Sequence, residues 1–412
     1  MCGIYFHAKK SNCFCFSDQH QKSVLRLNRN RGPNDEDIHT ARYKDWELQF
    51  NGFLLWLRGS RPQVQPLVKE NGNVLLWNGD VFNETSLLTE HKSDTESIAN
   101  RLSEASSSGT EILKVFTQLE GPGAFVFYHQ KMNTVWFGRD ILGRHSLLID
   151  VQPCHCILTS VAFRASSFNE VEALGIYQMN LNGTSTTIGL SPWANWKSVD
   201  PTVAWTVPIQ YHPSITSTLQ TLSPEKLDIA YTGIQQYLDS IEGADYVHQL
   251  QSNLEMAVSE RMQAQPKLCK NCCLKHNQQQ QQHRCIHCKT AILFSGGLDS
   301  TILALLAAKQ FSDTYEWNVA ENVSSSDGGL DLINVAFQQP DGQYDVPDRV
   351  TALQAFEEIQ SIYPSVSLNL VLVNVTKAEL QEKREDCIRD LLHPLDTVLD
   401  DSIGCAIWFA AR

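Results

Sequence analysis

Cys2, which directly follows the initiator Met1, is the first residue of this sequence that could do chemistry. Removal of Met1 would leave a thiol and a free α-amine on one residue. An α-amine has a pKa of about 8, so it can accept the thiol proton and produce the thiolate, which is the nucleophilic form of cysteine. A cysteine at the start of a strand can also have no role, and the accompanying motifs must decide between the two.

The hexapeptide "SGGLDS" at 295–300 is a candidate anion site, because it follows an apolar run and opens an amphipathic helix. Gly296 and Gly297 permit a close approach of the backbone, and amides at a helix N-terminus attract an anion. No Gly-Lys-Ser/Thr run follows, so this is not a Walker A loop. Asp299 suits a phosphate site if a metal joins it to the phosphates or if it orients the loop. A Gly-Gly turn with a capping residue is the alternative interpretation.

A third group is rich in cysteine and histidine and has the spacing C-x₂-C-x₁₂-C-x₂-C. Two thiolate pairs at this spacing can surround one tetrahedral Zn²⁺, which would be structural and would clamp the segment. Five consecutive glutamines separate the pairs, so a low-complexity loop with incidental cysteines is the alternative. The expected ligands are Cys269, Cys272, Cys285 and Cys288, and the spare candidates are Cys273, His276, His283 and His287.

Size and composition limit the class of protein. The 412 residues are enough for two or three domains with a sizeable core. With 46 acidic against 33 basic residues, the net charge of −13 argues against non-specific nucleic-acid binding, which needs a basic surface. No apolar run reaches the length of about 18 residues expected of a membrane span, and the N-terminus lacks a signal-peptide pattern. We therefore expect a cytoplasmic protein whose twelve cysteines are mostly free thiols, metal ligands or catalytic groups.

The elements that must position Cys2 lie in residues 1–190. Short apolar or aromatic runs bounded by Gly, Asn, Asp and Pro recur there, which is a strand pattern. Apolar residues at helical spacing mark two helices, at 94–107 and 110–120. Strands grouped in this way, with few helices between them, favour sheets packed against helices.

The rest of the chain divides into two parts. Residues 191–289 are expected to form a linker that contains the Cys/His-rich segment and one helix, at 237–263. Residues 290–412 alternate strand and helix, which predicts an α/β domain with a parallel sheet. The helix of the linker carries one apolar face, made of Val247, Leu250, Leu254 and Val258.

Six motifs accompany Cys2, and in their order they resemble the class II glutamine amidotransferase domain, an N-terminal-nucleophile hydrolase. The "SGGLDS" segment resembles the pyrophosphate loop of the N-type ATP pyrophosphatases. The combination is similar to the glutamine-hydrolysing asparagine synthetases, and the tail at 389–412 is most similar to their asparagine synthetase domain-containing subfamily. The motifs are "NRGPN" (30–34), "WLRGSRPQVQP" (56–66), "WNGDVFN" (77–83), "SDTE" (93–96), "GPGAFVFY" (121–128) and "FGRDILGRHSL" (137–147).

This resemblance implies a fold. Residues 1–190 should form an αββα sandwich, and residues 290–412 should form an α/β ATP-pyrophosphatase domain. The family carries a further Ser-Gly-x-Gly-Ala/Ser-Asp-Glu loop beyond this point, so the second domain is expected to be incomplete. The chain is then expected to hydrolyse glutamine and to lack part of its synthetase site.

The resemblance also implies a glutamine site. Cys2 would be the nucleophile, and the Asn78 side-chain amide and the Gly79 backbone N–H would stabilise the oxyanion. Arg58 would pair with the α-carboxylate of glutamine, and Asp94 with its α-ammonium. The alternatives are a surface arginine, a hairpin turn at Asn78-Gly79 and a helix cap at Asp94. Supporting roles would fall to Arg31 and Gly32 beside the nucleophile, and to Arg139 and Asp140 within the sheet.

In the second domain the resemblance implies that the "SGGLDS" loop holds the ATP phosphates with Mg²⁺. The nucleotide would lie near Phe294 and the end of "LINVAF" through backbone contacts. The "HPLDT" run at 393–397, with Asp400 and Asp401, falls where the family places part of its aspartate and ATP region. The phosphate-binding residues would be Ser295, Gly296, Gly297, Asp299 and Ser300.

The implied function is that of a glutamine-dependent asparagine synthetase-like ligase. Ammonia from glutamine would attack an adenylated aspartate and give asparagine, AMP and pyrophosphate. Glutamine, aspartate and ATP are then the expected partners, without nucleic acid or membrane, and the oligomeric state stays open. Two alternatives remain: a glutaminase or amidotransferase with another or a lost acceptor, and a non-enzymatic interaction protein that keeps both folds.

Overall fold

The structure is a computed structural model of the 412-residue chain. It divides into two compact units, Met1–Leu219 with Arg389–Thr397, and Gln220–Ile388 with Val398–Arg412. The prediction placed the boundaries at 190 and 289 instead, and it did not anticipate that a short C-terminal segment groups with the first unit. The described residues are 2–13, 15–57, 61–83, 93–105, 108–183, 187–193, 209–211, 241–266, 268–279, 285, 287–320 and 329–412.

The first sheet of the first unit has six strands and places β1 (Gly3–Lys10) in its interior. β1 pairs antiparallel with β3 (Trp46–Leu54) on one side and with β9 (His155–Thr159) on the other. Strand order is β10-β8-β9-β1-β3-β2, and the remaining members are β2 (Asp35–Tyr43), β8 (Leu148–Gln152) and β10 (Asn169–Glu170).

The second sheet has seven strands and contains β5 (Val74–Gly79), which pairs antiparallel with β6 (Gly123–His129). β5 lies against β1 of the other sheet. Strand order is β13-β12-β11-β7-β6-β5-β4, and the remaining members are β4 (Leu67–Val68), β7 (Thr134–Arg139), β11 (Gly175–Asn180), β12 (Ile188–Pro192) and β13 (Ile209–Tyr211).

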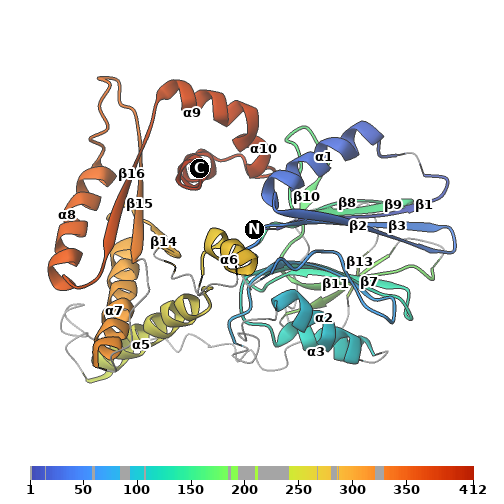
Figure 1. The fold of residues 1–412 in the computed structure, drawn as a ribbon. Coiled ribbons are helices and arrows are strands. Elements are labelled where there is room, and N and C mark those ends of the chain that lie inside the picture. The colour runs from blue at the N-terminus through green and yellow to red at the C-terminus, as the bar shows by residue number, and fades with distance from the viewer. Residues whose placement is uncertain are drawn as a thin grey trace. The chain divides into compact units, whose positions relative to one another are not determined.

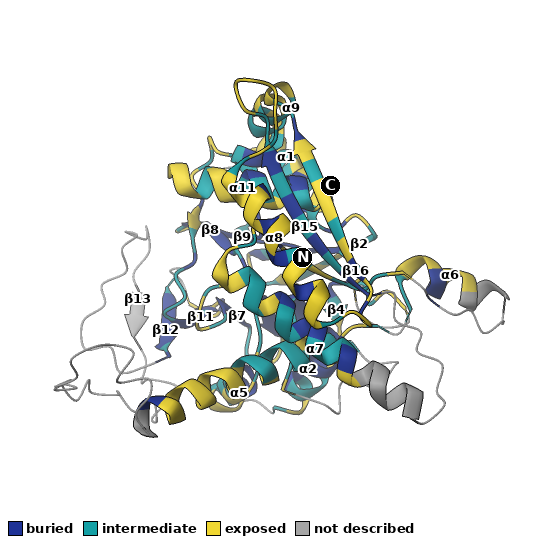
Figure 2. Cartoon of the chain, turned by 90° about the vertical axis from the view of Figure 1, so that its left-hand side faces the viewer, coloured by how far each residue is buried: buried dark blue, intermediate teal, exposed yellow. Residues whose placement is uncertain are grey.

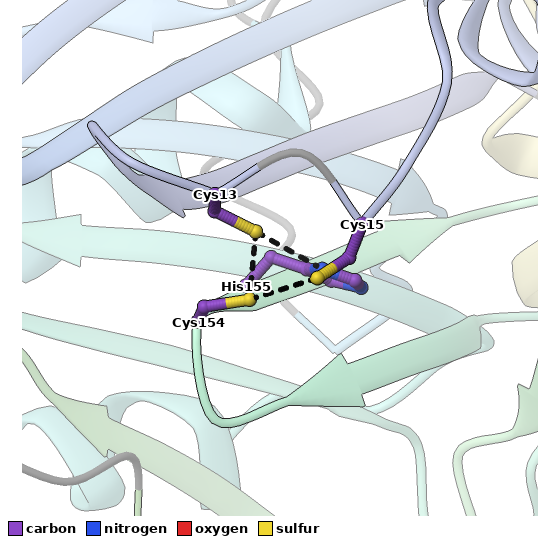
Figure 3. A group of neighbouring side chains, drawn as sticks. All are labelled: Cys13, Cys15, Cys154 and His155. Atoms are coloured by element: carbon purple, nitrogen blue, oxygen red, sulfur yellow. Dashed lines mark hydrogen bonds between the residues drawn. The ribbon is translucent and has the colours of Figure 1, made fainter.

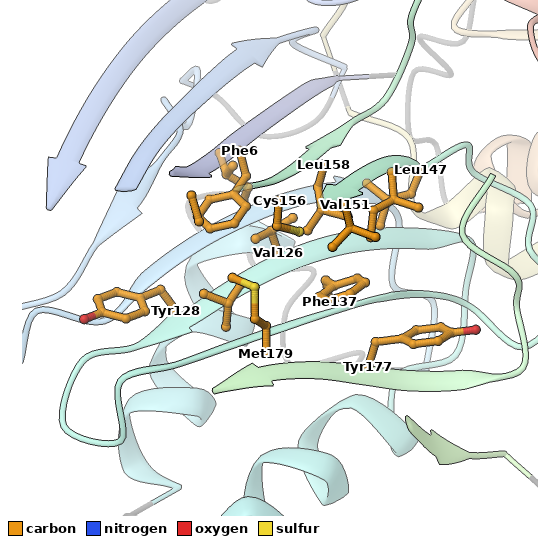
Figure 4. Close-up of a cluster of buried hydrophobic side chains, with 14 of the residues drawn as sticks. Phe6, Val126, Tyr128, Phe137, Leu147, Val151, Cys156, Leu158, Tyr177 and Met179 are labelled. Carbon is orange, nitrogen blue, oxygen red and sulfur yellow. The ribbon is translucent and has the colours of Figure 1, made fainter. Parts of the chain in front are cut away.

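The two sheets stack face to face between helices (Figure 1). α1 (Asp18–Arg31) covers the outer face of the first sheet, and α2 (Asp94–Glu104) with α3 (Gly109–Thr117) covers that of the second. The core between the sheets is built from alternate strand residues, among them Phe6, Val126, Phe137, Leu158 and Met179 (Figure 4). This is the predicted αββα order, and the helices at 94–107 and 110–120 are confirmed apart from their last residues.

Several elements of this unit were not predicted, and α1 and β2 show the reason. Only Val24, Leu27 and Asn28 of α1 are buried, so its apolar face is too narrow to give a clear periodic signal. β2 is an edge strand with charged, mostly exposed side chains, a composition that protects an edge against pairing with other chains. Both elements depend on the neighbouring sheet rather than on their own sequence.

The second unit contains the predicted parallel sheet, in the order β14 (Thr290–Leu293), β15 (Leu330–Phe337) and β16 (Leu368–Val375). Helices α7 (Leu298–Ala320) and α8 (Pro347–Ile362) connect the strands and share a core with them. The remaining helices are α5 (Ile241–Gln263), α6 (Lys270–Gln279), α9 (Lys377–Lys383), the π-helical turn η2 (Arg384–Ile388) and α11 (Val398–Ala410), while α10 (Arg389–Leu392) groups with the first unit.

The helix predicted at 237–263 is present as α5, but its apolar face is only partly covered. Val258 packs against the core of the second unit, whereas Val247 and Leu250 are exposed. Figure 2 shows that much of α5 is exposed or intermediate. Among the described residues, none of the helices combines the length and the apolar character that crossing a membrane requires.

Candidate active site

Cys2 directly precedes β1, and continuing the alternation of that strand gives the direction of its side chain. Ile4, Phe6 and Ala8 all belong to the core between the two sheets, so Cys2 faces the same layer. The thiol is half-buried, and its Sγ accepts a hydrogen bond from the Leu55 N–H at 3.4 Å and lies 3.9 Å from the Leu55 carbonyl oxygen. The nucleophile candidate is therefore held at the end of a strand in the middle of a sheet.

The "NRGPN" loop supports the segment that contacts this thiol. Gly32 ends α1 against β3, where an added Cβ would lie 2.0 Å from the Phe53 carbonyl oxygen, so only glycine fits. Asn34 donates its N–H to the Leu54 carbonyl at 2.9 Å and accepts the Trp56 N–H on Oδ1 at 2.8 Å. Leu55, the partner of the thiol, thus lies between two residues that this loop fixes.

The charges around Cys2 act in opposite directions. Burial raises the pKa of the thiol, and the Leu55 N–H, the positive N-terminus and Arg31 lower it, whereas the charge of Asp80 raises it further. Burial also lowers the pKa of Arg31 to about 10. Because the net shift of the Cys2 pKa is upward, the thiol is mostly protonated at neutral pH and requires a base to become a nucleophile.

Asn78, on β5, is 1% exposed and alternates with Leu76 and Val74, which belong to the core between the sheets. Within the described part of the chain, its Nδ2 is buried without a hydrogen-bond partner. Such a group costs about 1–3 kcal/mol, and buried unpaired donors call for an explanation. The amide faces the same layer as Cys2 and can donate to a ligand.

The backbone on either side of Asn78 is held by neighbouring groups. Gln65 accepts the Trp77 N–H at 2.6 Å and donates Nε2 to the Trp77 carbonyl at 2.9 Å, which completes the ladder of β5. At Gly79 an added Cβ would lie 2.3 Å from the Pro122 carbonyl oxygen. Since the charge of Asp80 acts on the Cys2 thiol, the end of β5 lies within electrostatic reach of the nucleophile.

Asp94 begins α2, but it is not the residue that caps it. The N-cap is Ser93, whose hydroxyl accepts the Glu96 N–H, while Asp94 Oδ2 accepts the Val81 N–H at 2.9 Å. Asp94 therefore orders the segment that follows Gly79, and its half-buried carboxylate stays a candidate for the α-ammonium of glutamine. Arg58, the candidate for the α-carboxylate, lies outside the described residues.

Arg139 and Asp140 brace the loop after β7. Arg139 donates to the His145 and Val171 carbonyls at 2.7 and 3.1 Å, and it pairs with Glu170. Asp140 accepts the Gly123 and Arg144 N–H groups at 3.1 and 3.0 Å. These contacts are structural, as expected for both residues.

The "SGGLDS" loop connects the end of β14 to α7. Ser295 Oγ accepts the Gly297 N–H at 3.3 Å and lies 3.3 Å from Ser300 Oγ, so the two hydroxyls lie together. Ser295, Gly297 and Asp299 are exposed. A loop with hydroxyls and helix N-terminal amides at the carboxyl end of a parallel strand is a common position for phosphate binding.

Hydrogen bonds connect the residues behind this loop, and the packing at Gly296 leaves no space for a side chain. Phe294 is buried, and its carbonyl accepts Asn334 Nδ2 at 2.8 Å, while Asn334 Oδ1 accepts Arg349 Nε at 2.6 Å. Gly296 has a φ of +77°, and an added Cβ would lie 2.3 Å from the Ala352 nitrogen in α8.

Gly296→Ala should therefore destabilise the second unit by about 1–3 kcal/mol, because overpacking and a left-handed φ act together. Gly297→Ala is the matched control, since the nearest atom to its added Cβ is Ser295 Oγ at 3.4 Å, and we expect a change within about 0.5 kcal/mol. Urea or thermal unfolding of both variants measures this difference. Equal stability of the two variants would contradict the packing described for Gly296.

Comparisons with known proteins bear on both units. Residues 56–165 match the family described as a glutamine amidotransferase domain. Asparagine synthetase domain-containing protein CG17486 of Drosophila melanogaster is 33% identical, over all of this chain and 74% of its own length. The chain belongs to the asparagine synthetase domain-containing protein family.

Vertebrate relatives agree with this assignment. Asparagine synthetase domain-containing protein 1 is 31% identical in Mus musculus and 29% in Homo sapiens, over all of this chain and 74% and 72% of those proteins. Among solved structures, glutamine phosphoribosylpyrophosphate amidotransferase from B. subtilis is 18% identical over 47% of this chain and 50% of its own, with a TM-score of 0.36. A structural similarity with this TM-score supports no conclusion by itself. The amidotransferase domain that the motifs predicted is confirmed in this family member.

The Cys/His-rich segment of this family member differs from the prediction in one ligand. Cys269, Cys272 and Cys285 lie together as expected, but the fourth member is His287, whose Nδ1 lies 3.4, 3.5 and 3.8 Å from their sulfurs. Cys288 lies outside the group, because the chain there already enters β14. Its sulfur accepts the Asn369 Nδ2 at 3.1 Å instead. The spare candidates His276 and His283 have no described side chains.

The electrostatics of this group suit a cation. Burial raises the pKa of Cys285, but hydrogen bonds from the N–H groups of Cys269 and His287 lower this pKa to about 6. Burial and the adjacent thiols raise the pKa of Cys272 to about 11. Three sulfurs and one imidazole nitrogen are a ligand set of structural zinc.

Two supporting residues lie within the quoted motifs, but the sequence alone assigned them no role. Gln65 and Asn34 act through hydrogen bonds to backbone groups that are distant in sequence or on another element, which no local pattern reveals. Asp400 and Asp401 lie in the first turn of α11, and Asp401 pairs with Arg384 at 2.6 Å. "HPLDT" groups with the first unit, where His393 Nε2 lies 3.2 Å from the Phe168 carbonyl oxygen.

Proposed function

We propose that this chain is a glutamine-dependent asparagine synthetase-like ligase of the cytoplasm. Glutamine hydrolysis at Cys2 would supply ammonia to an ATP-activated aspartate, giving asparagine, AMP and pyrophosphate. The observation that carries the proposal is the buried Asn78 amide, which has no partner in the described residues and faces the layer of Cys2. Twelve free cysteines also suit a reducing compartment.

Glutamine hydrolysis begins at the chain end. With Met1 removed, the α-amine of Cys2 accepts the thiol proton, and the thiolate attacks the carboxamide carbon of glutamine. Asn78 Nδ2 and the Gly79 N–H donate to the oxyanion of the tetrahedral intermediate. Collapse of the intermediate expels ammonia, which takes the proton from the amine and leaves a thioester. Water then hydrolyses the thioester to glutamate and restores the thiol.

The remaining groups orient glutamine. Asp94 accepts hydrogen bonds from the α-ammonium, and Arg58 pairs with the α-carboxylate. Asp94 suits this role because its Oδ2 already orders Val81, next to the oxyanion residues. Glutamine is thereby held by its α-ammonium and its α-carboxylate, so that its side-chain amide reaches Cys2.

Aspartate activation belongs to the second unit. ATP phosphates accept hydrogen bonds from the Ser295 and Ser300 hydroxyls and from the amides that begin α7. The aspartate β-carboxylate attacks the α-phosphorus, pyrophosphate leaves, and ammonia then displaces AMP from the acyl adenylate. The exposed Asp299 carboxylate is a hard oxygen ligand that would hold Mg²⁺ beside the phosphates, where the ion neutralises charge.

The deciding experiment uses the purified chain with loss of Met1 confirmed by mass spectrometry. We expect ammonia and glutamate from glutamine alone. Synthesis of asparagine and AMP from aspartate, ATP and Mg²⁺ is tested on a longer form that also carries the further Ser-Gly-x-Gly-Ala/Ser-Asp-Glu loop. Ammonia without asparagine would instead favour a glutaminase or an amidotransferase with another acceptor. A folded, Met1-free chain that produces no ammonia would overturn the proposal and favour an interaction protein.

We also propose that Cys269, Cys272, Cys285 and His287 hold a structural Zn²⁺. The four ligand atoms lie within 4.8 Å of one another, which a tetrahedral ion with bonds of about 2.0–2.3 Å requires. The ion would join α6 to the segment that enters β14. Zinc content of Cys269→Ser/Cys272→Ser should fall by one ion per chain relative to the unaltered protein.

A further inference from the structure

A second cysteine–histidine group lies in the first unit, apart from every residue that the proposed reaction uses. Cys13 and Cys15 belong to the segment between β1 and α1, and Cys154 and His155 lie at the turn from β8 to β9 (Figure 3). Cys154 Sγ lies 2.7 Å from Cys13 Sγ and 3.2 Å from Cys15 Sγ, and His155 Nδ1 lies 3.7 Å from Cys13 Sγ. All four ligand atoms lie within 4.8 Å of one another.

Thiols gathered this closely are unfavourable by themselves. The sulfurs are further apart than the bond of about 2.05 Å in a disulfide, and all three cysteines are free. Cys154 Sγ contacts the sulfurs of both Cys13 and Cys15, and a bound cation would explain why three thiols lie together.

We propose that Cys13, Cys15, Cys154 and His155 bind one structural Zn²⁺. Zinc–sulfur bonds of about 2.3 Å and zinc–nitrogen bonds of about 2.0–2.1 Å in a tetrahedron separate the ligand atoms by about 3.4–3.8 Å. The observed separations of 2.7 to 3.7 Å reach this spacing with small side-chain rotations. Three thiolates and one imidazole favour zinc over hard ions such as Mg²⁺.

The surroundings of His155 match those of a metal-binding histidine. The ring is 2% exposed and turns Nδ1 toward the cysteines, while Nε2 lies 3.6 Å from Asp150 Oδ2. Asp150 is itself held by the Ser167 hydroxyl at 3.0 Å. A carboxylate on that side of the ring favours a proton on Nε2, and a metal would then bind at Nδ1. The ring of Phe16, 6.4 Å away, packs beside it.

The ion would clamp two parts of the first unit that the backbone joins only weakly. Lys10 donates its N–H to the Cys154 carbonyl at 2.9 Å, and Cys13 donates to the Lys10 carbonyl at 2.8 Å. Beyond these bonds the segment runs from β1 into α1, and α1 ends at the Gly32 loop beside Cys2. Zinc would fix the segment that connects β1 to α1. This segment follows the end of β1 that lies farther from Cys2. Exposed Cys15 provides the path of entry.

The first test is metal content of the full chain, expressed with added zinc, purified under reductant and dialysed against zinc-free buffer. We expect Cys13→Ser/Cys154→Ser to contain one zinc ion fewer per chain than the unaltered protein. Cys387→Ser, a half-buried cysteine outside both groups, is the matched control and should lose none. The Cys269→Ser/Cys272→Ser variant should lose its own ion and keep this one. Equal zinc in the Cys13/Cys154 variant and the control would overturn the proposal.

Two milder variants keep the test decisive if the double variant does not fold. Cys15 is exposed, so Cys15→Ser should fold and weaken zinc binding at least about tenfold in competition with a chelator. Asp150→Asn, which removes the carboxylate behind His155 and keeps an oxygen for the Ser167 hydroxyl, should weaken it about 10- to 100-fold. Unchanged affinity in both would overturn the site. So would a Cys13–Cys154 disulfide in zinc-free protein that was isolated under a thiol trap.

Discussion

Cys2→Ala should abolish glutamine hydrolysis, with a loss of at least about 10³-fold in rate, since no other nucleophile is proposed to form the thioester. The side chain is half-buried and alanine is smaller, so the sheet around β1 should keep its stability. Ammonia release from glutamine, measured for both proteins after mass spectrometry confirms the loss of Met1, tests this expectation. Cys387→Ser controls for the removal of a half-buried thiol elsewhere and should hydrolyse glutamine at the unaltered rate.

A form with one additional residue ahead of Cys2 separates the thiol from its base. The thiol stays in place, but the α-amine becomes an amide and can no longer accept a proton. General-base catalysis contributes about 10²–10⁴-fold, so we expect a loss in that range. Hydrolysis at the full rate by the extended form would exclude the α-amine as the base. Full activity of Cys2→Ala would exclude the whole amidotransferase mechanism at this residue.

Asn78→Ala should lower the rate of glutamine hydrolysis by about 10²–10³-fold, which is the usual effect of removing one oxyanion donor. The cause is specific to the transition state, because the Nδ2 group has no partner within the described residues and its loss breaks no hydrogen bond there. We therefore expect kcat to fall while KM for glutamine changes little. Steady-state kinetics with glutamine measures both.

A matched control and a second readout separate this role from a structural one. Asn100, on α2, pairs through its Oδ1 with Lys69, and Asn100→Ala should leave hydrolysis unchanged. Alkylation of Cys2 by iodoacetamide does not pass through a tetrahedral oxyanion, so Asn78→Ala should keep the unaltered rate of that reaction. A parallel fall in alkylation and hydrolysis would mean that Asn78 supports the nucleophile rather than the oxyanion.

The sequence by itself determined much of the local structure. The interior strands, such as β5, β6 and β7, are continuous apolar and aromatic runs because both of their faces are buried. The "SGGLDS" turn was predictable for a similar reason, since glycine at 296 is required by a positive φ that is a local property of the chain. Family membership also followed from short motifs in a fixed order.

Elements with weak periodicity were decided by tertiary contacts. α1 buries only three residues and β2 is an exposed edge strand, so neither carries enough apolar pattern to be recognised. For α5 the helix was predicted correctly, but the burial of its apolar face was not. Its spacing is helical, but Val247 and Leu250 stay exposed, because periodicity reports the helix and not what covers it.

The two cysteine–histidine groups show that sequence spacing has the same limit in predicting binding sites. The spacing of the cysteines at 269–288 predicted three ligands of one group correctly, yet the fourth depends on where the chain turns into β14, so His287 replaces Cys288. In the other group, Cys13 and Cys154 are 141 residues apart, and only the pairing of β1 with β9 brings them together. Spacing can specify a site within one segment, whereas sheet topology decides a site built from two.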